Sequence, residues 1–188
     1  MSRTFTPARP IAASSMSGLR LAFASSLLAA AFLAAPGAHA AVASASASST
    51  VVAPIAIVKS ADLAFGKFAA TTGGSLTVST SGARSITGGV VLMAGATSTA
   101  ARFDVTGETD ATYSIALGGS TTLVSGGNSM TFATVSDLTG ANSTSGNVSS
   151  GTLTGGAQSI YVGGVLTVAS AQAAGTYTGS VTATVEYN

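Results

Sequence analysis

The sequence predicts an all-β fold, and three observations support this prediction. Apolar and polar side chains alternate over several short runs, which is the period of a strand with one face in a core. Val and Thr fill these runs, and β-branched residues favour pleated strands. Glycine pairs separate many of the runs, and no segment after the first 40 residues has a helical period over three turns. We therefore predict an immunoglobulin-like antiparallel β-sandwich of roughly eight to ten strands.

The first 40 residues have the pattern of a secretory signal peptide. Arg3, Arg9 and Arg20 make the leader basic, and an apolar run over residues 21–35 follows them. This run is shorter than the ~20 residues that a membrane-spanning helix needs. The small residues that end at Ala40 fit a cleavage site. We expect cleavage after Ala40 and export by the Sec route, through the periplasm to the cell surface or the extracellular medium.

Residues 41–49 differ from the rest of the exported chain. After Val42 they alternate Ala with Ser and contain no bulky side chain that would anchor them in a core. We expect an N-terminal arm here, either outside the core or in the form of an extended strand. Residues 50–188 are predicted to form a single β-sandwich domain, because a chain of about 140 residues suits one hydrophobic core.

Apolar positions two residues apart mark the strands of this domain in chain order. The pairs and runs are Leu76 with Val78, Phe103 with Val105, Tyr113 with Ile115 and Leu117, Met130 with Phe132, Ile160 with Val162, and Leu166 with Val168. The clearest strand is the last one, from Tyr177 to Tyr187. Every even-numbered residue in it is polar, and every odd-numbered residue is apolar, aromatic or Gly.

Glycine pairs mark the expected turns, because Gly readily adopts the positive φ angles of tight hairpins. These pairs are Gly73-Gly74, Gly88-Gly89, Gly118-Gly119, Gly126-Gly127 and Gly155-Gly156. Gly163-Gly164 lies inside a strand pattern, and it predicts a bulge or a close approach of two backbones. Residues 139–156 are almost entirely Gly, Ser, Thr and Asn, so we expect a long exposed loop there.

The composition indicates a structural or binding protein and not an enzyme. The chain has no Cys, and its single His, His39, belongs to the predicted leader. The exported chain therefore has neither a thiol nor an imidazole for nucleophilic catalysis. Charged residues make up 7% of the chain and the net charge is +1, which excludes the basic surface that nucleic-acid binding needs. We predict no catalytic residue, no cofactor and no nucleic-acid partner.

One local group of carboxylates, Asp104, Glu108 and Asp110, allows more than one interpretation. We favour a solvated turn between a strand that ends near Thr106 and a strand that begins near Thr112. Carboxylate oxygens are also calcium ligands, and two carboxyl groups can act as acid and base. No metal site is predicted, and calcium binding at this group stays open as an alternative.

The C-terminal strand resembles part of a known family. Gly175 is the fourteenth residue from the C-terminus, Tyr187 is the penultimate residue, and the positions after Tyr177 alternate. This pattern resembles the closing motif of chaperone–usher pilus subunits. The wider chain, with VVAPIAIVKSADLAFGKF, GGVVLM, ARFDVTG and LTVASAQAAGTYTGSVTATVEYN, resembles an uncharacterised family of secreted proteobacterial domains akin to pilins and spore-coat-U-type sandwiches.

The pilin resemblance implies an incomplete sandwich that lacks its last strand. A periplasmic chaperone, and then the N-terminal arm of the next subunit, would supply the missing strand. The residues that would line the edge of the groove are Gly175, Tyr177, Val181, Ala183, Val185 and Tyr187. The implied function is a structural subunit of a fimbria-like fibre or surface coat, with a chaperone and an usher as partners and a homopolymer as the product.

Two alternatives fit the same strand pattern. In the first, the fold is complete, the last strand is an ordinary terminal strand, and the protein is a monomeric secreted or cell-surface binding domain of the adhesin type. The second is a small outer-membrane barrel. The chain ends in Asn188 and not in an aromatic residue, and it has few aromatic residues for the girdles of a barrel. We therefore expect that the protein is not an integral membrane protein.

Overall fold

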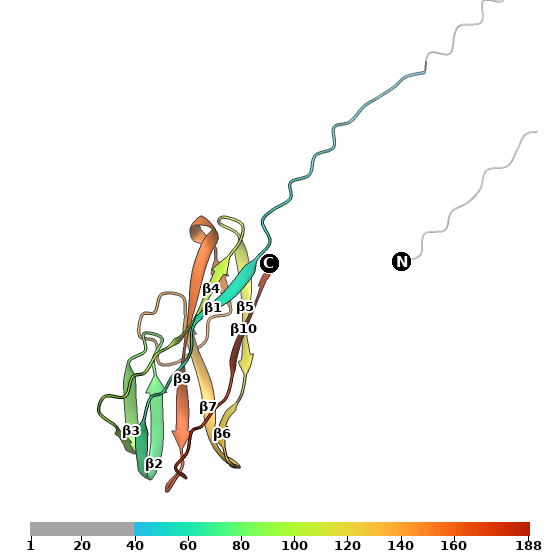
Figure 1. The fold of residues 1–188 in the computed structure, drawn as a ribbon. Helices are drawn as coiled ribbons and strands as arrows, with labels where there is room; N and C mark the ends of the chain where they lie inside the picture. The colour runs from blue at the N-terminus through green and yellow to red at the C-terminus, as the bar shows by residue number, and fades with distance from the viewer. Residues whose placement is uncertain (1–39) are drawn as a thin grey trace, which may run out of the picture. The chain divides into compact units, whose positions relative to one another are not determined.

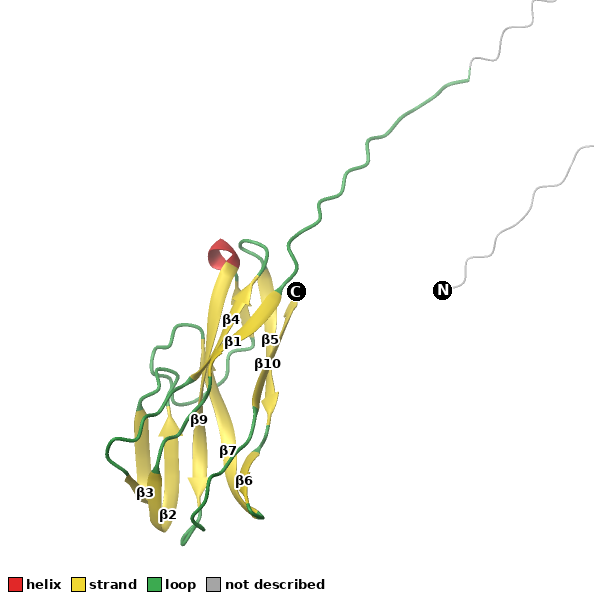
Figure 2. Cartoon of the chain, in the orientation of Figure 1, coloured by secondary structure: helices red, strands yellow, loops and turns green. Residues whose placement is uncertain are grey.

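The computed structural model describes residues 40–188, which contain ten strands and one short 3-10 turn (Figures 1 and 2). The strands are β1 (Ala56–Ala61), β2 (Phe68–Val78), β3 (Arg84–Leu92), β4 (Ala101–Thr106), β5 (Thr112–Gly119), β6 (Thr122–Ser125), β7 (Asn128–Asp137), β8 (Ser150–Thr152), β9 (Ala157–Val168) and β10 (Val181–Tyr187). The 3-10 turn, η1, spans Thr154–Gly156. In this described part no helix has the length and apolar character needed to cross a membrane. Apart from Ala40, the predicted signal peptide lies outside the described residues.

The ten strands form two antiparallel sheets, which confirms the predicted antiparallel β-sandwich. The larger sheet has the order β1-β4-β9-β2-β3, and β7 also pairs with β9 and carries β6. Strand β9 is its centre, because β7 pairs along one edge while β4 and β2 share the other edge. The smaller sheet has the order β10-β5-β8. Both sheets are open at their edges within residues 40–188.

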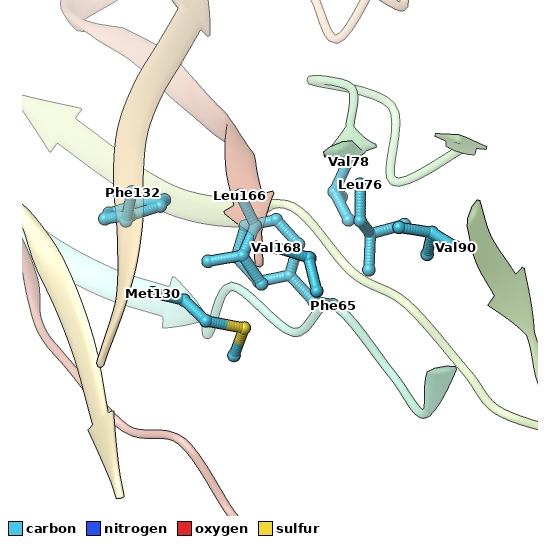
Figure 3. Packing of buried hydrophobic residues seen from close by; sticks show 8 residues of the cluster. All are labelled: Phe65, Leu76, Val78, Val90, Met130, Phe132, Leu166 and Val168. Carbon is cyan, nitrogen blue, oxygen red and sulfur yellow. The ribbon is translucent and has the colours of Figure 1, made fainter. Parts of the chain in front are cut away.

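Two clusters of buried apolar side chains fill the sandwich. The first core joins β2, β3, β7 and β9 with Phe65 from the β1–β2 connection (Figure 3). Phe65 packs edge-on against Phe132, with ring centroids 5.9 Å apart. The second core lies between the sheets, since it combines Phe103 of β4 and Ile160 of β9 with Tyr113 of β5. The alternating apolar residues of the sequence are therefore the inward faces of these strands.

Strand β9 changes its neighbour at Gly163-Gly164. Up to Val162 this edge of β9 pairs with β4, and from Gly164 onward it pairs with β2. A Cβ atom at Gly163 would collide with the carbonyl oxygen of Val78, and one at Gly164 would collide with the ring of Phe132. The predicted close approach is thus confirmed, because only glycine leaves room for the end of β2 and for the first core.

The prediction of turns at glycine pairs is right for two of the five pairs and wrong for two. Gly155-Gly156 lies in η1, and Gly118-Gly119 forms the end of β5. Gly126-Gly127 forms the two-residue loop between β6 and β7, and both residues have positive φ, as a type I′ turn requires. Gly73-Gly74 and Gly88-Gly89 instead lie inside β2 and β3. There Gly74 pairs with Gly88 beside a bulge, and their backbones approach too closely for side chains. Local sequence does not distinguish such a bulge from a turn.

The predicted exposed loop over residues 139–156 is present only in part, because a strand and a 3-10 turn occupy its end. Residues 150–152 form β8 and pair with β5, and Leu153 is fully buried in the second core. The single leucine of this polar segment anchors it, since burying a Leu side chain contributes about 1.5–3 kcal/mol.

Candidate functional site

Strand β10 has one paired edge and one free edge within residues 40–188. It pairs with β5 from Val181 opposite Gly119 to Tyr187 opposite Tyr113. Because β10 stands first in the order β10-β5-β8, its other edge presents backbone N–H and C=O groups to no strand of the described chain. Such an edge is a template for a further strand.

The predicted strand from Tyr177 is interrupted before it reaches the regular part of β10. Thr178 forms an isolated bridge with β6, and regular pairing with β5 begins at Val181. Between these points the amide of Ser120 donates to the carbonyl oxygen of Ser180 at 2.8 Å, and the Ser180 amide donates to the Ser120 hydroxyl at 3.0 Å. This irregular stretch lines an open depression of about 610 Å³, whose other walls are also formed by Gly, Ser, Thr and one Val, with no charged or aromatic side chain.

One face of β10 is apolar and half-buried. The side chains that pack against the second core from this face are Val181, Ala183, Val185 and Tyr187. The alternate residues, Thr182, Thr184 and Glu186, are exposed. None of the four apolar residues reaches the nearly complete burial of the central strands, because β10 has a hydrogen-bonded neighbour on one side only. The free edge therefore borders partly uncovered apolar surface.

The structure does not bring the other two predicted edge residues to β10. Gly175 is exposed in the connection between β9 and β10, next to the hydroxyl of Ser125. Tyr177 packs against the first core, and its hydroxyl donates to the carbonyl oxygen of Ala173 at 2.8 Å and accepts from the side-chain Nε2 of Gln172 at 2.7 Å. The residues of the predicted edge that share one strand face are thus the four from Val181 to Tyr187.

A contact that the sequence analysis missed joins the end of β10 to the segment before β1. The hydroxyl of Tyr187 donates to the carbonyl oxygen of Ala53 at 2.8 Å and accepts from the amide of Glu108 at 2.6 Å. The amide of Ala53 in turn donates to the carboxylate of Glu108 at 3.0 Å. We call Ala53, Glu108 and Tyr187 the terminal clamp. No local pattern predicts it, because its members are far apart in the sequence.

The segment before β1 carries exposed valines. The side chains of Val51 and Val52 are 95% and 52% exposed, and Val58 of β1 is 65% exposed. Strand β1 pairs with β4 alone, so its second edge is also free within the described residues. No charged residue lies between Ala40 and Val58. This uncharged segment and the β10 edge meet at the terminal clamp.

The three carboxylates of the acidic group, Asp104, Glu108 and Asp110, lie in three different environments. Asp104 lies on β4, where its carboxylate accepts from the Ser159 hydroxyl at 2.7 Å and from the guanidinium of Arg102 at 2.8 Å. The Ser159 hydrogen bond is the main cause that lowers the pKa of Asp104, against the opposing effect of burial. Glu108 belongs to the terminal clamp, and Asp110 is exposed in the turn between β4 and β5. The predicted turn between Thr106 and Thr112 is confirmed, and residues 40–188 hold no cluster of three potential metal ligands.

Asp137 organises the polar loop that follows β7. Its carboxylate accepts hydrogen bonds from the Thr80 hydroxyl at 2.6 Å, the Ser143 hydroxyl at 2.9 Å and the amides of three residues: Thr139, Gly140 and Ala141. Burial raises the pKa of Asp137, but these hydrogen bonds outweigh it and leave the pKa below its ordinary value. The sequence signal was an Asp three residues before a Gly at the start of a polar loop, which is typical of an Asx turn.

Comparisons with known proteins identify a family for this chain. Searches of the curated proteins and of the solved structures gave no match. Residues 55–187 match the family model described as "Domain of unknown function (DUF4402)". The matched segment runs from just before β1 to the end of β10, so it contains every described strand. The chain therefore belongs to the DUF4402 family of uncharacterised domains.

Proposed function

We propose that this protein is a non-enzymatic, secreted structural subunit of a fimbria-like fibre or surface coat, in which the N-terminal arm of one copy adds as a strand to the β10 edge of the next. The observation that carries the proposal is the free edge of β10 beside its half-buried apolar face. A strand added there would satisfy the edge backbone groups and cover Val181, Ala183 and Val185.

The free edge of β10 lacks the features that prevent a further strand from pairing, which supports the proposal that such a strand occupies it. Free edges in monomeric proteins are commonly blocked by charges, proline or bulges along the strand. Strand β10 contains one charge, Glu186, and its seven residues hold regular pairing with no proline and no bulge. The irregular stretch near Ser180 lies before the strand, and the pairing from Val181 to Tyr187 is continuous.

The composition of the arm suits a shallow acceptor. Residues 41–47 place Ala at odd positions and, after Val42, Ser at even positions, so an extended arm has one apolar and one polar face. The small side chains of the arm are sufficient to cover the apolar face of β10, because this face is already half-buried. The proposal includes a relation to chaperone–usher pilins and spore-coat-U-type subunits, Sec export, and a periplasmic chaperone and an usher as partners.

A monomeric secreted or cell-surface binding domain is the second candidate. It is favoured by the internal completeness of the fold: in the described part, every buried side-chain nitrogen and oxygen has a hydrogen-bond partner. Such a domain would use β10 as an ordinary terminal strand.

Export of the full chain from a bacterial host without added partners separates the two candidates. A subunit that needs an added strand should aggregate, polymerise or be degraded when it is produced alone, because its edge and apolar face stay uncovered. A complete domain should accumulate as a soluble monomer, which light scattering coupled to size-exclusion chromatography would detect. A stable monomer at high concentration would contradict the proposed function.

A further inference from the structure

The terminal clamp fixes the residue at which the N-terminal arm leaves the sandwich. Both backbone polar atoms of Ala53 are held: the carbonyl oxygen by Tyr187 and the amide by Glu108. Pro54 follows directly and restricts Ala53 to extended conformations. Residues 48–52 lie before the clamp and are exposed. The exit point is thus at the C-terminal end of β10, as Figure 1 shows by the position of the C-terminus beside the start of β1.

This exit point creates a competition between two positions for the arm. The arm, residues 41–49, and the three residues that join it to the clamp make twelve residues, and β10 has seven. At about 3.3 Å per residue, an arm that folded back at the clamp could cover the whole β10 edge of its own subunit. A short tether gives such an intramolecular contact an effective concentration in the millimolar range. Without a constraint, an arm would therefore close on its own subunit before it reached a second copy at micromolar concentration.

We propose that Tyr187 and Glu108 are positioning residues that hold Ala53 so that the arm leaves its own β10 edge, which keeps that edge available for the arm of a second copy. This inference rests on the proposed function and adds a means of regulation to it. The two hydrogen bonds hold Ala53 in place and oppose a reversal of the chain at this residue, so closure within one subunit would have to place its turn in residues 48–52. Loss of the clamp releases the arm to cap its own edge, and the capped chain is a monomer.

Cross-linking of the exported chain tests the inference. The chain has no natural Cys, so the substitutions Ala47→Cys in the arm and Thr184→Cys on β10 provide the thiols. A flexible bis-maleimide then joins arm to strand, and mass spectrometry with denaturing gels separates cross-links within one chain from cross-links between chains. With the clamp intact, we expect products between chains to dominate at micromolar concentration.

The decisive variants are Tyr187→Phe and Glu108→Ala in the same double-Cys background. Each removes one hydrogen bond to Ala53, and we expect the ratio of products between chains to products within one chain to fall by about tenfold. Glu108→Ala keeps the Tyr187 ring, so it preserves the test if Tyr187→Phe folds poorly. The matched control is Tyr113→Phe, which removes the phenol oxygen that donates to the side chain of Gln158 on β9 of the larger sheet, a hydrogen bond that does not involve Ala53.

The outcomes separate the inference from the proposed function. An unchanged product ratio in both clamp variants, with polymers still formed, would overturn the clamp and leave the proposed function in place. If the ratio of products between chains to products within one chain fell equally in Tyr113→Phe, a general loss of stability would explain the effect. This result would also overturn the proposed role of the clamp. If the chain with an intact clamp gave no cross-link between arm and β10 of either kind, both proposals would fail together.

Discussion

The hydroxyl of Tyr187 donates a 2.8 Å hydrogen bond to the carbonyl oxygen of Ala53, which lies 134 positions earlier in the chain. Tyr187 is the last residue of β10, and Ala53 stands three residues before β1. The contact therefore ties the first strand of the domain to the last one. Because the same hydroxyl also accepts from the Glu108 amide, one atom joins three separate segments of the chain.

The first prediction concerns this hydroxyl. Tyr187→Phe should lower the free energy of unfolding by about 1–2 kcal/mol, because two hydrogen bonds are lost while the ring still packs on the second core. Urea denaturation measures this loss. Limited proteolysis should also cut faster next to Val51 and Val52, where the released segment becomes more mobile. An unchanged unfolding midpoint would show that the clamp adds no stability.

The second prediction contrasts the two faces of β10. Val185→Asp places a carboxylate on the half-buried apolar face and should cost several kcal/mol or force that carboxyl to stay protonated. Thr184→Asp changes an exposed side chain and should stay within about 0.5 kcal/mol. Urea denaturation at neutral pH gives both values. Equal effects of the two substitutions would contradict the assignment of the inward face.

The third prediction concerns the arm. Residues 41–49 are exposed and contain no strand, so their deletion should leave the unfolding midpoint of the sandwich unchanged. Under the proposed function the deletion should abolish polymers, which electron microscopy and sedimentation detect, and leave chaperone binding intact. Normal fibres from the truncated chain would exclude the arm as the added strand.

The fourth prediction is a dependence of stability on pH that Asp137 causes. The folded pKa of this carboxyl lies below its ordinary value of 3.8. Its contribution to stability is therefore fully present above the unfolded pKa and is lost as the pH falls through the folded pKa. Asp137→Asn should reduce the loss of stability on acidification from about pH 5 downward. Urea midpoints across this range measure it, with Asp104→Asn as a comparison at a more exposed carboxyl.

The fifth prediction addresses the point where β9 changes its neighbour. Gly163→Ala should lower the free energy of unfolding by about 1–3 kcal/mol, because the new methyl group meets the backbone at Val78 and Ser79. Gly118→Ala is the control, since its methyl group would meet only the hydroxyl of Thr182 at 3.0 Å. A milder effect at Gly163 than at Gly118 would contradict the close approach.

Strands could be predicted from the sequence where one face is buried. The alternation around Tyr113, Ile160 and Val185 follows directly from the period of two residues, because a strand with one inward face must place apolar residues there. Gly163-Gly164 was also informative, since glycine inside an apolar run indicates that another chain lies close by.

Contacts between distant segments could not be predicted in the same way. Gly74 and Gly88 have the local features of turn residues, and only their pairing with each other identifies them as part of a bulge. Tyr187 was visible as the end of an alternating strand, but its hydrogen bonds to Ala53 and Glu108 depend on the three-dimensional arrangement. The burial of Leu153 depends likewise on the position of the second core.

The central place of β9 has a consequence for the order in which the protein folds. Three strands that precede it in the sequence, β2, β4 and β7, pair with it, and it begins at residue 157 of 188. The larger sheet therefore cannot assemble until most of the chain has been synthesised. Pairings of such long sequence separation fold slowly, on the scale of about milliseconds to seconds. An emerging chain thus lacks the strand that joins β2, β4 and β7 until β9 has been synthesised, and only local pairings such as β2 with β3 can form before it.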